Sequence, residues 1–77
     1  MKIRATFHGS IRRPWEESSR ELDVAEGTSI EALLTSLGYE PQEIRRLAVV
    51  VNRRRRKLSA ELEPDDDVRF VLLAGGG

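Results

Sequence analysis

The sequence has 77 residues, with no cysteine, one histidine, and 13 basic side chains balanced by 13 acidic ones. This length suffices for one small domain and leaves little volume for a deep substrate cavity. The lack of cysteine excludes a thiolate nucleophile and a disulfide framework, and a single histidine excludes a multi-histidine metal cluster. No apolar run reaches the length of a membrane span, and the N-terminus lacks a secretory signal. We therefore expect a cytoplasmic protein that is not an enzyme by itself.

The first predicted elements in chain order are two strands joined by a long loop. Residues 2–7 alternate apolar and polar side chains, which is the period of a half-buried strand. Residues 11–19 show no such period and contain a proline, so they are interpreted as a loop. A second strand is predicted at residues 20–24, with Leu22 and Val24 facing inward.

A helix is predicted over residues 28–37. Thr28 and Glu31 have the spacing of a capping box, in which the two side chains each satisfy an unpaired backbone N–H group. A glycine and then a proline follow the helix, and residues 41–46 are predicted to add one further helical turn. The apolar residues of the first helix recur at the spacing of a single buried face: Ile30, Leu33, Leu34 and Leu37.

Two further strands are predicted in the C-terminal half. Residues 47–51 are β-branched and apolar on both faces, which indicates a buried strand. Asn52 stands where this strand must turn, a basic run is expected to cover the turn, and residues 58–62 are interpreted as an irregular piece or edge strand. Residues 64–67 have the composition of a turn, and residues 68–73 are predicted to form a strand inside the sheet.

The order of the predicted elements is strand, strand, helix, strand, strand. This order indicates an α+β fold, a mixed four- to five-stranded sheet with one main helix packed on one face. The first and last strands are then expected to be neighbours, as in a ubiquitin-like β-grasp fold. We expect residues 1–74 to form this single domain and residues 75–77 to be a flexible C-terminal glycine tail.

The basic run consists of five consecutive cations: Arg53, Arg54, Arg55, Arg56 and Lys57. One interpretation is a solvated turn that keeps an edge strand from pairing. Another is docking to an acidic partner protein. RNA binding is disfavoured because no aromatic side chain that stacks on bases lies nearby. The three adjacent carboxylates at residues 65–67 are interpreted as turn residues and not as a metal site.

The last three residues are Gly75, Gly76 and Gly77. A glycine triplet at a chain end adds no packing and loses the most conformational entropy on ordering, so a frayed end is one interpretation. Glycine is also the residue that can thread a channel too narrow for a Cβ atom. The terminal carboxylate has an ordinary pKa of about 3.5 and is ionised at neutral pH. Held by a partner enzyme, it is a nucleophile toward the α-phosphate of ATP.

In this context the tail resembles that of the MoaD/ThiS family of sulfur carrier proteins. The matching features are Gly76 and Gly77 after a core strand, the capped helix, the strand and asparagine at residues 48–52, and the turn at residues 65–68. Asp66 stands where the family turn often has glycine, and we expect Asp66 to adopt the left-handed conformation there.

The resemblance implies that Gly77 is adenylated by an ATP-using enzyme related to ubiquitin activators, while Gly75 and Gly76 thread the tail into partner sites. Sulfur from a donor then replaces AMP and gives a C-terminal thiocarboxylate. The implied acceptors are the large subunit of molybdopterin synthase or the thiazole synthase of thiamin biosynthesis, and related carriers serve tRNA thiolation. The carrier itself holds no cofactor, and ATP is used by its partner.

Two alternatives follow from the same residues. Related proteins attach to lysines, so the chain is alternatively a ubiquitin-like modifier. It is otherwise a β-grasp binding module whose basic run, residues 53–57, holds RNA or an acidic protein while the tail is idle.

Overall fold

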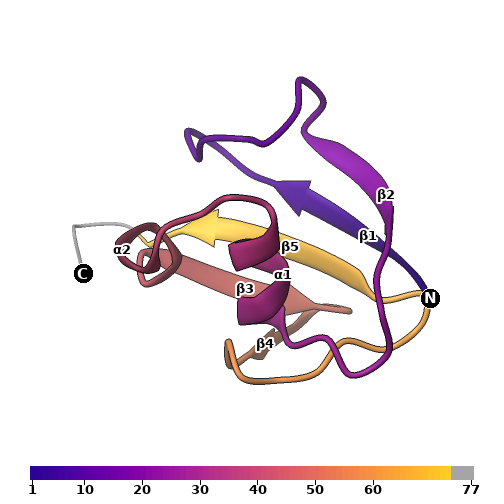
Figure 1. Ribbon diagram of the computed structural model, residues 1–77. Helices are drawn as coiled ribbons and strands as arrows, with labels where there is room; N and C mark the ends of the chain where they lie inside the picture. Colours follow the sequence, from indigo (N-terminus) through magenta and orange to yellow (C-terminus); the bar gives the residue numbers. More distant parts are fainter. Residues whose placement is uncertain (74–77) are drawn as a thin grey trace.

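The computed structural model describes residues 1–73, which form a mixed five-stranded sheet (Figure 1). Neighbouring strands are antiparallel except β1 and β5, which are parallel. The first and last strands are therefore neighbours, as predicted, and the α+β architecture with one main helix is confirmed. In sheet order the strands are β2 (Ser19–Asp23), β1 (Lys2–Phe7), β5 (Asp67–Leu72), β3 (Leu47–Val51) and β4 (Arg54–Arg56).

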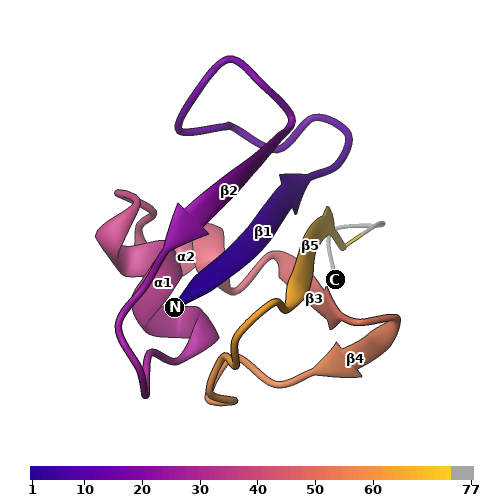
Figure 2. The same cartoon turned by 90° about the vertical axis from the view of Figure 1, so that its right-hand side faces the viewer.

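The core lies between one face of this sheet and α1 (Ile30–Ser36) (Figures 1 and 2). The alternation in β1 buries Ile3, Ala5 and Phe7. The helix contributes Ile30, Leu33 and Leu34 from the predicted apolar stripe, and central β5 contributes Val68 and Phe70, which are both 0% exposed. The sheet face toward α1 is thus buried at these positions.

The predicted capping box of α1 is wrong. Ser29, and not Thr28, is the N-cap, and its hydroxyl accepts a hydrogen bond from the Ala32 N–H at 3.0 Å. The Thr28 carbonyl accepts from the Leu62 N–H at 2.8 Å, so Thr28 still belongs to an extended segment paired with a distant part of the chain. This long-range bond moves the helix start beyond Thr28, and Glu31 does not serve as the distal carboxylate of a cap.

The predicted second helical turn exists as α2 (Pro41–Ile44). Pro41 occupies its start, where the missing N–H is not needed, and Ile44 is buried. The backbone N–H of Glu40 donates to the Glu43 carboxylate at 2.9 Å, which stabilises the first turn. Among residues 1–73, no helix is long and apolar enough to cross a membrane.

Only Arg53 of the basic run lies in the turn after β3, because three of the other residues form the edge strand β4. Asn52 and Arg53 have positive φ values of 51° and 72° and make a two-residue hairpin turn. Such turns match the twist of antiparallel strands, and asparagine tolerates the left-handed region. The chain therefore reverses immediately after β3 and pairs back at once, with Val51 opposite Arg54. Residues 58–62 are irregular, with a single bridge between Ser29 and Glu61.

The turn before β5 differs from the prediction in one residue. Asp65 adopts the left-handed conformation, with φ at 67°, and Asp66 does not. Asp66 is instead buried, and its carboxylate accepts from the Asn52 side-chain amide and from the Glu63 N–H, both at 2.8 Å. These hydrogen bonds hold the Asp66 side chain inward. The left-handed residue of the turn is therefore Asp65 and not Asp66.

Asn52 and Asp66 together join the two turns at one end of the sheet. The Asn52 side-chain oxygen also accepts from the Asp67 N–H at 2.9 Å, and its backbone N–H donates to the Asp67 carbonyl at 3.0 Å. Both side chains are thus committed to holding β3 and β5 in register at the end of the sheet opposite to the C-terminal end of β5.

We predict that Asp66→Ala lowers the free energy of unfolding by about 2 kcal/mol, because it removes the acceptor of two part-buried hydrogen bonds. Urea denaturation followed by circular dichroism measures the change. Glu63→Ala is the matched control, since its side chain is exposed, and we expect a change within about 0.5 kcal/mol. Equal effects of the two substitutions would contradict this role of Asp66.

Candidate functional site

The residues predicted to carry the chemistry, Gly75, Gly76 and Gly77, lie outside the described residues. The structure does show where the chain leaves the sheet. The Leu73 N–H donates to the Arg46 carbonyl at 2.9 Å, which extends the β3–β5 pairing one residue beyond Leu72. The candidate site is therefore built around the end of β5.

Three large apolar side chains are exposed at this point. Val71, Leu72 and Leu73, which we call the tail base, have exposed fractions of 39%, 42% and 37%. They belong to or follow the central strand of the sheet, where apolar side chains are normally covered. Contiguous exposed apolar side chains on a small protein mark an interaction site.

Val71 alternates with the buried Val68 and Phe70, so it lies on the open face, the sheet face opposite to α1, and is exposed there. Its cross-strand neighbour on this face is Ala48, and the next pair is Arg69 with Val50. Val50 in turn pairs with Arg55 of β4. The open face therefore carries a small apolar centre with arginines beside it. The sequence indicates that such a face exists, because the single predicted main helix covers only one side of the sheet.

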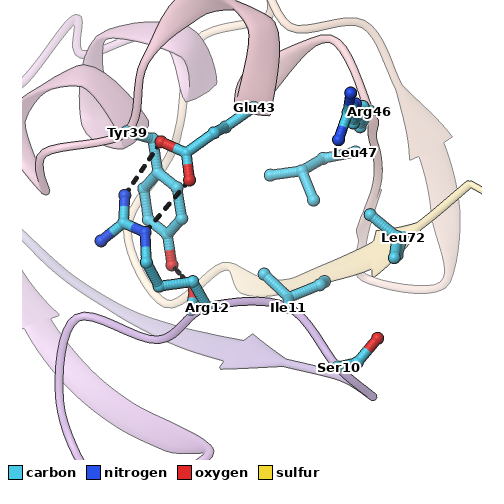
Figure 3. Close-up of a pocket in the computed structure, with 8 residues that line it drawn as sticks. All are labelled: Ser10, Ile11, Arg12, Tyr39, Glu43, Arg46, Leu47 and Leu72. Carbon is cyan, nitrogen blue, oxygen red and sulfur yellow. Dashed lines mark hydrogen bonds and ion pairs between the residues drawn. The ribbon is translucent and has the colours of Figure 1, made fainter.

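Leu72 points to the opposite face, where it lines a hollow of about 200 Å³ (Figure 3). Apolar side chains of the hollow come from the long loop, from β3 and from the end of β5. Residues 53–57 do not take part. The lining residues are Ser10, Ile11, Arg12, Tyr39, Glu43, Arg46, Leu47 and Leu72.

An ion pair closes one side of this hollow. Arg12 donates to both carboxylate oxygens of Glu43, each at 3.0 Å, and its guanidinium lies 4.6 Å from the centre of the Tyr39 ring (Figure 3). The Tyr39 hydroxyl donates to the Arg12 carbonyl. The hydrogen bonds from Arg12 and the backbone bond from Glu40 hold the pKa of Glu43 below its usual value. The ion pair therefore fastens the long loop to α2 beside the tail base.

Trp15 lies further along the same loop and packs against the core. Its ring meets Phe7 edge-on, with ring centres 5.8 Å apart, and the Arg20 guanidinium lies 4.8 Å from the Trp15 ring. The loop is thus held by aromatic contacts at Trp15 and by the ion pair at Arg12, which the sequence pattern did not indicate.

The basic run lies away from this hollow, at the edge of the sheet. All five side chains are exposed, and none makes an ion pair within residues 1–73. Arg55 alone is placed by the strand register on the open face beside Val50. Arg54 and Arg56 alternate to the other side of β4, and Arg53 lies in the hairpin turn.

Of the carboxylates at residues 65–67, Asp65 lies in the turn, Asp66 follows the turn and bonds back to the Glu63 N–H, and Asp67 is the first residue of β5. Within the described part of the chain, no group of three histidine, cysteine, aspartate or glutamate side chains is placed to hold a metal ion.

Comparison with known proteins agrees with this geometry. A model of the ThiS family matches residues 9–77, which includes the three terminal glycines. Among curated protein sequences, none matches the chain significantly.

Solved structures match over nearly the whole chain at low sequence identity. SAMP1 from Haloferax volcanii has a TM-score of 0.75 at 11% identity and covers 100% of both chains. A putative molybdopterin converting factor, subunit 1, from Pyrococcus furiosus has a TM-score of 0.74 at 15% identity, covering 95% of this chain and 98% of the other. A third matching structure is the complex of subunits 1 and 2 of the molybdopterin-converting factor from Helicobacter pylori. The match has a TM-score of 0.66 at 17% identity and covers 100% of both chains. These likenesses establish the β-grasp fold.

We predict that Arg12→Ala raises the pKa of Glu43 toward its ordinary value of 4.5, because the substitution removes the two hydrogen bonds that favour the carboxylate. An NMR titration of the Glu43 side-chain carboxyl measures the change. A depressed folded-state pKa contributes stability above the unfolded value, and this contribution is lost as the pH falls through the folded value. The wild type should therefore lose more stability than the variant on acidification below pH 4.5.

The control for this prediction is Arg13→Ala, which removes a neighbouring exposed arginine. We expect it to leave the Glu43 titration unchanged. A Glu43 pKa that is the same in the wild type and in Arg12→Ala would show that the ion pair does not persist in solution.

Proposed function

The chain belongs to the ThiS family, and we propose that it is a sulfur carrier whose C-terminal Gly77 is adenylated and converted to a thiocarboxylate. Members of this family are small carrier proteins and not catalysts. The observation that carries the proposal is the family match through the terminal glycines, at the end of a strand that exposes Val71, Leu72 and Leu73. The reactive group is then the end of the main chain.

The proposed reaction has two steps. A carboxylate oxygen of Gly77 attacks the α-phosphorus of ATP, the bond to pyrophosphate breaks, and an acyl adenylate forms on the partner enzyme. A sulfide equivalent from a sulfur donor then attacks the carbonyl carbon, and AMP leaves with one oxygen. Gly75 and Gly76 have no Cβ atoms, which allows the tail to enter narrow sites on the adenylating enzyme and on the acceptor.

The tail base is the proposed docking surface for both partners. Val71 lies on the open face and Leu72 on the opposite side, so a partner that surrounds the chain exit contacts apolar side chains on either side of β5. Burying exposed apolar side chains is the main source of favourable free energy in such contacts.

The proposed sulfur acceptor belongs to thiamin or molybdopterin biosynthesis, or to tRNA thiolation. Supporting the molybdopterin branch, two of the structural matches are molybdopterin converting factor subunits, one of them in a complex with subunit 2. The second candidate function is a ubiquitin-like modifier. It is kept because SAMP1, a protein named as a small archaeal modifier, shares the fold. Both functions begin with adenylation of Gly77.

We predict that the chain, incubated with an adenylating enzyme of this family, ATP and a sulfide source, gains the mass of one sulfur in place of one oxygen. Intact mass spectrometry measures the product. The variant lacking Gly76 and Gly77 should show no gain. An unchanged wild-type mass, where a known carrier is converted by its own enzyme, would contradict the sulfur-carrier proposal, and lysine adducts in cell extract would favour the modifier.

We further predict that Val71→Asp raises the KM of the adenylating enzyme for the carrier by about tenfold, because a carboxylate enters an apolar contact. Steady-state pyrophosphate release measures the KM. Thr35→Asp is the matched control, since it adds the same charge at an exposed position of α1, and we expect less than a twofold change from it, roughly the noise of surface substitutions. Equal KM values for the two variants would exclude the open face from docking.

A further inference from the structure

Within residues 1–73, the edge strand β4 has a free side, since it pairs there only with β3. We propose that this edge binds an extended acidic segment of a partner protein, which adds to the sheet as a sixth strand next to Arg55. The proposal goes beyond the sulfur-carrier function, because β4 lies on the side of β3 that faces away from β5. It also holds whether or not Gly77 carries sulfur.

The direction of the backbone groups in β3 identifies the free groups of β4. The Asn52 N–H donates to the Asp67 carbonyl, and the Arg46 carbonyl accepts from Leu73, so the even-numbered positions of β3 face β5. Backbone groups of successive strand residues point to opposite sides. Val49 and Val51 therefore direct their N–H and C=O groups toward β4.

The register then assigns the bonds of β4. Val51 is opposite Arg54 and Val49 is opposite Arg56, so Arg54 and Arg56 use their backbone groups on β3. Arg55 lies between them and directs its N–H and C=O away from the sheet. The carbonyl of Lys57 accepts from Ala60, so the chain turns away after β4. The free edge is short and is centred on Arg55.

Charge decides which strand fits this edge. The five cations of the basic run have no ion-pair partner within residues 1–73. Two copies of this edge repel one another, which protects it from self-pairing. A strand with acidic side chains is attracted, and two backbone hydrogen bonds to Arg55 give it register.

The two other occupants fit less well. The opposite edge of a second copy is β2, whose Glu21 and Asp23 already pair with Lys2 and the N-terminal amine. RNA that binds through unpaired bases needs exposed aromatic side chains to stack on. The four aromatic residues of the chain pack in or against the core instead: Phe7, Trp15, Tyr39 and Phe70.

Amide hydrogen exchange on the full 77-residue protein tests the proposal directly. The probe is a synthetic peptide that alternates glutamate and valine. In the free protein, we expect the amides of Arg54 and Arg56 to be protected and that of Arg55 to exchange quickly. Saturating peptide should slow Arg55 exchange by about tenfold or more, because its N–H gains an acceptor. Binding without protection of Arg55 would overturn the proposal.

Two variants separate the backbone bond from the charge. Arg55→Thr removes the side-chain charge and keeps the N–H, whereas Arg55→Pro removes both, at an edge position where proline is tolerated. We expect Arg55→Pro to bind the peptide about three- to tenfold more weakly than Arg55→Thr, as expected for one lost hydrogen bond. Equal affinities of the two folded variants would contradict strand addition.

The competing occupants, RNA and a second copy of the chain, are tested by separate measurements on the wild-type protein. A single-stranded oligouridylate is the RNA probe, and sedimentation measures self-association. Tighter binding of the oligouridylate than of the peptide, or a concentration-dependent dimer that buries Arg55, would overturn the assignment of this edge to an acidic strand. If Arg55→Pro fails to fold, the exchange experiment on the wild type still decides.

Discussion

The structure depends on a simple imbalance: the sheet has two faces, and the single main helix covers one of them. Apolar side chains such as Phe70 and Val68 are buried against α1 and supply the core. Alternation along the central strand then places Val71 on the face that nothing in residues 1–73 covers. An exposed apolar side chain on a central strand is therefore a consequence of the architecture. It lies near the end of β5, close to the last residue that the structure describes.

The two ends of the sheet are held in different ways. At one end, side-chain hydrogen bonds of Asn52 and Asp66, one of them partly buried, join the hairpin turn to the start of β5. At the other end, the Arg12–Glu43 ion pair and the loop close the hollow beside Leu72 with exposed groups. Exposed pairs contribute little free energy, so the end near the tail is the more easily rearranged one.

Much of the architecture was predictable because it rests on local periodicity. The period of two in β1, the apolar run of β3 and the stripe of α1 each identify an element within a few residues. The wrong predictions for the helix cap and for the turn before β5 concern residues whose partners lie far away in the chain. Thr28 pairs with Leu62, and Asp66 bonds to Asn52, so neither has the local role that its neighbours suggested. The ion pair of Arg12 with Glu43 was missed for the same reason.

The sequence by itself determined the order of the elements, the buried helix face and the terminal glycines, because these follow from residue type and spacing along the chain. Tertiary structure decided which residues of the basic run form a strand, which backbone groups of Arg55 face outward, and which apolar side chains of the last strand remain exposed. Those properties depend on strand register and on what covers each face. Both are set by contacts between segments, some adjacent in the chain, as in the β3–β4 hairpin, and some far apart, as between β1 and β5.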